Sequence, residues 1–152
     1  MAEPVRRLID GANYAHLATL LPNGAPHSVP VWVGLDGDRI ALMTSPNSRK
    51  ARNLERDPRV ALSITDHARP LVMATVRGRV AERVDGDRAW TIIDRLSQKY
   101  LGQPYPLRTD RVSVPDRARV RARRHLRVTE HDPGDQRSWL HRPAPWALSG
   151  CG

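Results

Sequence analysis

The sequence between residues 29 and 54 limits the fold more than any other stretch of the chain. It combines an apolar strand pattern at 29–33, a turn at Asp36-Gly37, a second strand pattern at 40–44 and a short basic helix. Two strands joined by so short a turn pair in antiparallel fashion. The tight loop at 45–47 leads from the second strand directly into the helix, which Pro58 ends.

Turn and helix signals divide the rest of the chain. We predict helices at 4–10 and 48–57 and a longer one from Asp85 to Gly102, and strands at 14–21, 26–34, 39–44, 60–65, 71–84 and 111–114. The first three strands are expected to form an antiparallel meander, and Gly78 to place a bulge or bend inside the long strand at 71–84. Pro115 is expected to interrupt the sixth strand, whereas partial alternation at 119–129 is compatible with a last strand.

These elements predict a mainly β protein with short helices, of the α+β class, whose strands form a small closed barrel. The length of 152 residues favours one domain, which we place at 1–129. Residues 130–152 are rich in Pro, Gly and Trp without periodicity, and we predict an irregular tail there.

Charge and cysteine content limit the classes of binding partner and the covalent links that the chain can form. The net charge is +9, and six arginines lie between residues 117 and 127, so an anionic partner is favoured. Nucleic acid is not favoured as a partner, because no helix-turn-helix or RNA-binding signature accompanies these arginines. Cys151 is the only cysteine, which rules out an intrachain disulfide, and no apolar run is long enough to span a membrane. The N-terminus resembles no secretory signal, so we expect a cytoplasmic protein.

The segment from residue 44 to residue 53 is the strongest candidate for a binding site. Free N–H groups at a helix N-terminus attract a phosphate, and nearby cations complete the charge match. The predicted phosphate ligands are Thr44, Ser48, Arg49, Lys50 and Asn53, the last placed on the same helix side as Arg49 and Lys50. The alternative is an exposed basic helix with ordinary capping by Asn47 or Ser48.

The strand before that segment is a candidate wall for a flat ring. Val29, Val31 and Trp32 supply apolar surface, although core packing is the more common role of such a tryptophan. Pro26 and Pro30 lack N–H groups, so their strand is expected at a sheet edge or a bulge. The six histidines show no metal-binding spacing and no GxSxG nucleophile motif is present. We therefore expect no metal, and we nominate no catalytic residue.

Several segments together resemble the pyridoxamine 5'-phosphate oxidase-like split β-barrel proteins. Residues 14–20, 22–26 and 30–32 resemble the opening of that family, and residues 48–54 and 56–63 resemble its phosphate-binding helix and the following strand. Val76-Arg77-Gly78-Arg79-Val80 matches its long strand. Lys99-Tyr100-Leu101-Gly102, with Tyr105-Pro106, is similar to the branch that uses the deazaflavin coenzyme F-420.

The resemblance implies a six-stranded split barrel that works as a homodimer with two cofactor sites at the interface. It implies hydride transfer between coenzyme F-420 and a small organic acceptor, with FMN as the alternative cofactor and non-catalytic coenzyme binding as the alternative role. Arg49, Lys50 and Asn53 would hold the phosphate region, with Thr44 just before them. Val29, Val31 and Trp32 would run along the ring, and Lys99 and Tyr100 would reach the site from the partner chain. The sequence after Pro115 departs from the family pattern.

Overall fold

The computed structural model describes residues 1–108 and 114–118. The predicted strand at 119–129, the tail at 130–152 and most of the arginine-rich segment lie outside the described residues. The elements, in chain order, are α1 (Glu3–Asp10), β1 (Ala15–Leu20), β2 (Pro26–Val31), β3 (Val33–Asp36), β4 (Arg39–Leu42), α2 (Arg49–Arg56), β5 (Arg59–Thr65), β6 (Met73–Arg79), β7 (Glu82–Val84), α3 (Gly86–Leu101) and β8 (Val114–Ala118).

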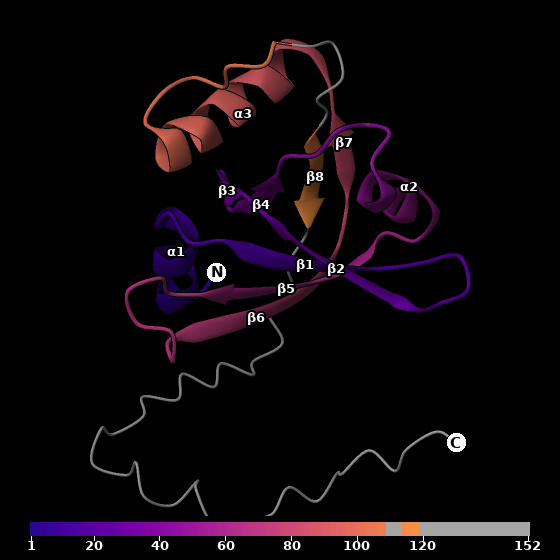
Figure 1. Cartoon of the computed structure of the whole chain (residues 1–152), viewed down its shortest axis with the longest axis horizontal. Helices are drawn as coiled ribbons and strands as arrows, with labels where there is room; N and C mark the ends of the chain where they lie inside the picture. Colours follow the sequence, from indigo (N-terminus) through magenta and orange to yellow (C-terminus); the bar gives the residue numbers. More distant parts are fainter. Residues whose placement is uncertain (109–113, 119–152) are drawn as a thin grey trace, which may run out of the picture.

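The described strands form two four-stranded antiparallel sheets rather than the closed barrel expected from the pattern of elements. The first has the order β2-β1-β5-β6 and the second the order β3-β4-β8-β7. The strand predicted at 26–34 breaks at Trp32, so that β2 pairs with β1 while β3 pairs with β4 in the other sheet. The expected meander is therefore wrong as a single sheet, because its middle strand passes from one sheet to the other (Figure 1). As expected from its two prolines, β2 is an edge strand.

The long strand predicted at 71–84 is also divided between the sheets. Gly78 pairs in regular register with Val60, so the bulge predicted at Gly78 is wrong. The break comes instead at Val80 and Ala81, between β6 and β7. There the Val80 N–H donates to the Pro58 carbonyl at 2.8 Å, which fixes the chain as it crosses between sheets.

The strand expected at 111–114 begins later. β8 starts at Val114 and lies between β4 and β7, with Pro115 opposite Arg83. Pro115 therefore does not interrupt the strand as predicted. The pairing of β8 with β4 shifts register between Ile40 and Ala41. An irregular ladder of this kind tolerates a residue such as proline, which has no N–H to donate.

The main hydrophobic core fills the space between the two sheets and is closed by α1. Side chains from both sheets meet there with Val5, Leu8 and Ile9 of α1. On β4, alternation sends Ile40 and Leu42 into this core, whereas Ala41 faces the other way. The second sheet is thus covered on both faces.

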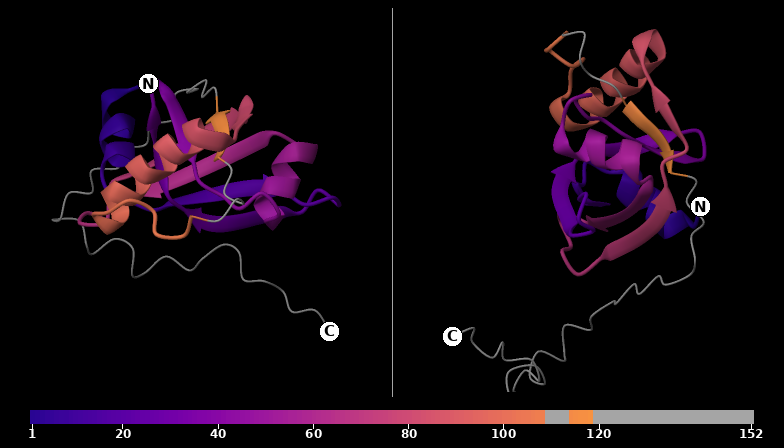
Figure 2. Two further views of the ribbon diagram at one scale, coloured as in Figure 1. Left: turned by 90° about the horizontal axis from the view of Figure 1, so that it is seen from above. Right: turned by 90° about the vertical axis from the view of Figure 1, so that its right-hand side faces the viewer.

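A second, smaller core joins the outer face of the second sheet to α3. Ala41 and Val84 contact the apolar stripe of the helix, which consists of Ala89, Ile92, Ile93 and Leu96. This stripe follows the spacing of three and four that predicted the helix. Gly102 ends α3 in the left-handed conformation with φ of 70°, as its sequence position indicated. Figure 2 shows α3 packed across the sheet from two further directions. None of the described helices has the length and apolar character needed to cross a bilayer.

Candidate functional site

A cavity of about 280 Å³ opens where the first sheet passes into the second, beside the N-terminal end of α2. It is lined by Tyr14, Pro30, Val31, Trp32, Met43, Thr44, Ser45, Lys50 and Tyr105. Four of the predicted site residues, Val31, Trp32, Thr44 and Lys50, therefore lie around one cavity. Val29 does not line it and packs instead at the edge of the main core.

The N-terminus of α2 is held by two hydroxyl groups. Ser48 caps the helix, because its Oγ accepts a hydrogen bond from the Ala51 N–H at 3.2 Å. The Thr44 Oγ1 and Ser48 Oγ lie 2.8 Å apart and share a hydrogen bond. The capping role predicted as the alternative for Ser48 is thus confirmed. The same contacts hold buried Thr44 between the end of β4 and the helix.

Lys50 is the cation that reaches the cavity. It is half-buried, and burial lowers the pKa of its ammonium group. No carboxylate in the described part of the chain forms an ion pair with it. Arg49, one residue earlier, is exposed and lines none of the described cavities. The two cations therefore differ, and only Lys50 presents an unpaired charge to the cavity.

Asn53 does not share the exposed side of Arg49, contrary to prediction. Its side chain is 1% exposed, and its Nδ2 donates to the Thr19 Oγ1 at 3.0 Å. Thr19 Oγ1 in turn lies 3.3 Å from His27 Nδ1. Asn53 therefore joins α2 to β1 and β2 rather than lining the cavity. The prediction failed because a spacing of four residues places two side chains on neighbouring parts of a helix, while contact with β1 decides which of them is buried.

Trp32 belongs to a cluster of aromatic side chains. Its ring stacks on Tyr100 with centroids 5.0 Å apart and planes 7° apart, and meets the edge of Tyr105 at 6.1 Å. Tyr14 contacts the other side of the cluster, 5.4 Å from the Tyr100 centroid. Trp32 thus packs against its own chain and still presents surface to the cavity, so both roles weighed for it apply.

Sequence reasoning did not name Tyr14, Met43 or Tyr105 as cavity residues. Of these three residues, only Met43 could have been found from the sequence, because it directly precedes the predicted site residue Thr44.

Lys99 and Tyr100 are engaged within their own chain. The Tyr100 hydroxyl donates to the Asn13 carbonyl at 2.6 Å and accepts from the Val33 N–H at 3.2 Å. The Lys99 ammonium donates to the carbonyls of Ile9, at 2.6 Å, and Val33. Tyr100 therefore lies behind Trp32, and Lys99 faces a different cavity, between α1 and α3. These contacts give no support to the prediction that both residues reach a partner chain.

The described residues contain no group of three or more His, Cys, Asp or Glu side chains arranged to hold a metal ion. No histidine lines any of the three described cavities. What the site at α2 offers is a cation, a capped helix N-terminus and an aromatic wall. That combination suits an anionic ligand with a flat ring.

Comparison with known protein families places the chain. The family model described as pyridoxamine 5'-phosphate oxidase matches residues 1–131. The chain belongs to the pyridoxamine 5'-phosphate oxidase-like family. The match includes the two sheets and three helices of the described residues and the cavity at α2. Among curated protein sequences, none gives a significant match.

Several solved structures resemble the chain in fold. An F420 reductase is 30% identical, with a TM-score of 0.65 over 77% of this chain and 94% of the other. A conserved hypothetical protein from Mycobacterium tuberculosis is 28% identical, with a TM-score of 0.59 over 75% of this chain and 78% of the other. A heme binding protein from Mycobacterium smegmatis is 27% identical, with a TM-score of 0.56 over 79% of this chain but 52% of the other. Proteins of one fold thus have names that indicate different functions, so the function of this chain has to be argued from the residues of its site.

Proposed function

We propose that this family member is an oxidoreductase that transfers a hydride between deazaflavin coenzyme F-420 and a small organic acceptor. The two sheets, joined by the continuous segments β2–β3 and β6–β7, would correspond to the six-stranded split barrel of the family. The similarity to an F420 reductase over 94% of that chain supports this choice of cofactor. The polyanionic coenzyme also suits a chain with a net charge of +9.

The observation that carries the proposal is the unpaired, half-buried charge of Lys50 at the cavity. A desolvated ammonium without a carboxylate is unfavourable on its own, and a phosphate group would compensate for the lost hydration. Ser48 orders the start of α2, whose N–H groups add to the positive potential there. In this proposal Lys50 holds the phosphate region, while exposed Arg49 contributes to the field around it.

The aromatic wall would orient the ring. Trp32, supported from behind by Tyr100, offers a fixed apolar surface, and Met43 and Tyr14 lie around the same cavity. The bound coenzyme supplies the hydride chemistry, so the chain needs no catalytic acid or base. Its own residues bind the phosphate, set the plane of the ring and limit the access of water.

A second copy of the chain would complete the site. At about 280 Å³, the cavity lies just below the usual range for small-ligand pockets and is too small to enclose the whole coenzyme. A homodimer with the cavity at its interface, as the family resemblance implies, would enclose the remainder.

The decisive test is a fluorescence titration of coenzyme F-420 with the wild-type protein and Lys50→Met. Loss of one charge-assisted contact should weaken binding by about 1–3 kcal/mol, or roughly five- to 150-fold. The matched control is Arg52→Met, which removes a charge from an exposed position of the same helix that lines no described cavity. That control should bind within about threefold of the wild type, because exposed charges contribute little.

Equal losses in Lys50→Met and Arg52→Met would reduce the effect to general charge attraction and contradict the site. Titration with FMN in parallel distinguishes the cofactors, since the preferred one should bind more tightly and show the Lys50 dependence. Turnover of the reduced coenzyme with quinones and enones separates an enzyme from a protein that only stores the coenzyme. Tight binding without any turnover would support the storage role and contradict the enzyme.

A further inference from the structure

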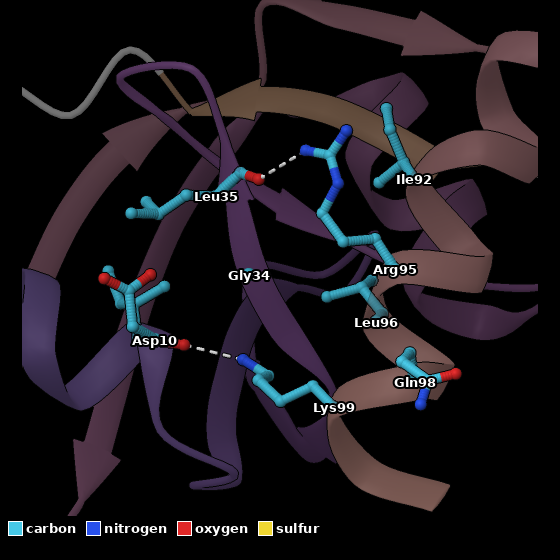
Figure 3. Close-up of a pocket in the computed structure, with 9 residues that line it drawn as sticks. Asp10, Gly34, Leu35, Ile92, Arg95, Leu96, Gln98 and Lys99 are labelled. Atoms are coloured by element: carbon cyan, nitrogen blue, oxygen red, sulfur yellow. Dashed lines mark hydrogen bonds between the residues drawn. The ribbon is translucent and has the colours of Figure 1, made fainter. Parts of the chain in front are cut away.

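A larger cavity, of about 450 Å³, lies away from the site at α2, between the end of α1, strand β3 and helix α3. Figure 3 shows its lining residues, which are Ile9, Asp10, Gly34, Leu35, Ile92, Arg95, Leu96, Gln98 and Lys99. None of these residues lines the cavity beside α2. We call it the α1–α3 cavity.

The walls of the α1–α3 cavity are mainly apolar. Ile9 comes from α1, Leu35 from β3, and Ile92 and Leu96 from α3. Gly34 forms part of the wall without a side chain of its own, so the cavity extends to the backbone of β3. A volume of this size lies within the range of small-molecule pockets and admits a chain or ring of moderate size.

Lys99 places a cation at one end of the apolar space. Its ammonium group has three N–H donors, and two of them bind the carbonyls of Ile9 and Val33. The remaining donor has no hydrogen-bond partner among the described residues, although the ammonium also lies 4.7 Å from the centroid of the Tyr100 ring. Figure 3 shows the ammonium directed toward the end of α1, at the margin of the cavity. A further acceptor, best a negatively charged one, would satisfy this donor.

The other charges around the cavity leave room for an anion. Arg95 extends across the opposite end and donates to the Leu35 carbonyl at 3.2 Å. Asp10, at the end of α1, is exposed and is the acidic group that acts on Lys99. β3 presents the Val33 carbonyl to Lys99 rather than a charged side chain. Two cations and one carboxylate thus line the cavity. Arg95 also lies 4.0 Å from the Asp36 carboxylate, so Lys99 is the lining cation that has no ion pair among the described residues.

We propose that the α1–α3 cavity binds a small monocarboxylate with an apolar body, and that Lys99 is the residue that recognises its carboxylate. The apolar body lies against Ile9, Leu35, Ile92 and Leu96. This site is separate from the coenzyme site at α2, so a ligand in it does not compete for Lys50. It also explains a lysine that is desolvated yet has no ion-pair partner in the described part of the chain.

The proposal has a definite pH dependence. Desolvation lowers the pKa of Lys99 to about 8, although Asp10 acts in the opposite direction. The free protein therefore loses this charge as the pH rises through about 8, and a bound carboxylate would raise the pKa again. Carboxylate affinity should stay high up to about pH 7 and should fall as the pH rises through about 8.

The test is a calorimetric or ligand-observed NMR titration of the full chain with octanoate, with octanamide as the uncharged probe of the same length. Octanoate should bind at least about tenfold more tightly than octanamide at pH 7, which corresponds to one charge-assisted contact. That advantage should disappear in Lys99→Met and should shrink at pH 9.5 in the wild type. Lys50→Met, altered at the other cavity, should bind octanoate as the wild type does.

A second variant guards against misfolding of Lys99→Met. Leu35→Trp fills the cavity from the half-buried position of Leu35 and should abolish binding of both probes while the far-ultraviolet spectrum stays native. Equal affinities for octanoate and octanamide, or binding that survives Leu35→Trp, would overturn the proposal. A change of oligomeric state in Leu35→Trp without any octanoate binding to the wild type would show instead that a second copy covers the cavity.

Discussion

At the scale of single residues, Gly34 shows how closely β3 approaches α3. A Cβ added at this position would lie 2.5 Å from the Leu96 Cδ2, closer than packed side chains tolerate. Leu96 is 3% exposed and belongs to the core that joins α3 to the second sheet, so any shift of its side chain toward the α1–α3 cavity loses contacts in that core. The absence of a side chain at Gly34 therefore sets the spacing between helix and sheet.

Gly34→Ala should lower the free energy of unfolding by about 1–3 kcal/mol, because the added methyl group overpacks this contact. Urea denaturation followed by circular dichroism measures the change. The double variant Gly34→Ala/Leu96→Val should lose less than the sum of the two single variants, since the shorter side chain makes room for the methyl group. Strict additivity would show that Leu96 is not the obstacle.

At the scale of elements, α2 depends on its contacts with the first sheet. An eight-residue helix is too short to be stable alone. This one contains three arginines but only two apolar residues, Ala51 and Leu54. Ser48 caps its start, Asn53 binds Thr19, and the Arg56 guanidinium donates to the Leu20 carbonyl. These bonds fix the helix against β1 and so hold Lys50 at the cavity.

Asn53→Ala should destabilise the protein by about 1–3 kcal/mol, because it leaves the buried Thr19 hydroxyl without its donor. The matched control is Asn47→Ala, at an exposed position just before the helix, which should change stability by less than about 0.5 kcal/mol. Thermal and urea unfolding of both variants give the comparison. Equal stabilities would mean that the bond from Asn53 to Thr19 does not anchor α2.

At the scale of the whole molecule, two continuous segments of the chain connect the two sheets. β2 continues into β3 and β6 into β7, so each sheet receives strands from the same two stretches of chain (Figures 1 and 2). The cavity at α2 lies at the first of these crossings. The cavity therefore lies at a junction between the two sheets rather than within one sheet.

We expect sedimentation equilibrium to give about twice the chain mass of 17.1 kDa at micromolar concentrations. A homodimer that completes the cofactor site should also tighten when coenzyme F-420 is added, because binding and assembly are linked. A monomer that binds the coenzyme with full affinity would contradict the shared site.

Local signals were enough for most of the helices and turns. Ser48 at the start of α2, Gly102 at the end of α3 and the turn at Asp36-Gly37 each act through neighbouring residues of the chain, so a linear pattern reveals them. The basic helix after β4 was predicted for the same reason, and with it the place of Lys50. The family resemblance added the expectation of a split barrel, which no periodicity contains.

The sequence by itself determined the elements, the charged helix and the apolar strand that precedes it. Only the tertiary structure decided that Asn53 is buried while Arg49 is exposed, that Lys99 and Tyr100 bind their own backbone, and that the strands break at Trp32 and Val80. The physical reason is the separation along the chain over which each kind of interaction acts. Capping and turns depend on residues a few positions apart, whereas burial and strand crossing depend on which distant segments pack together.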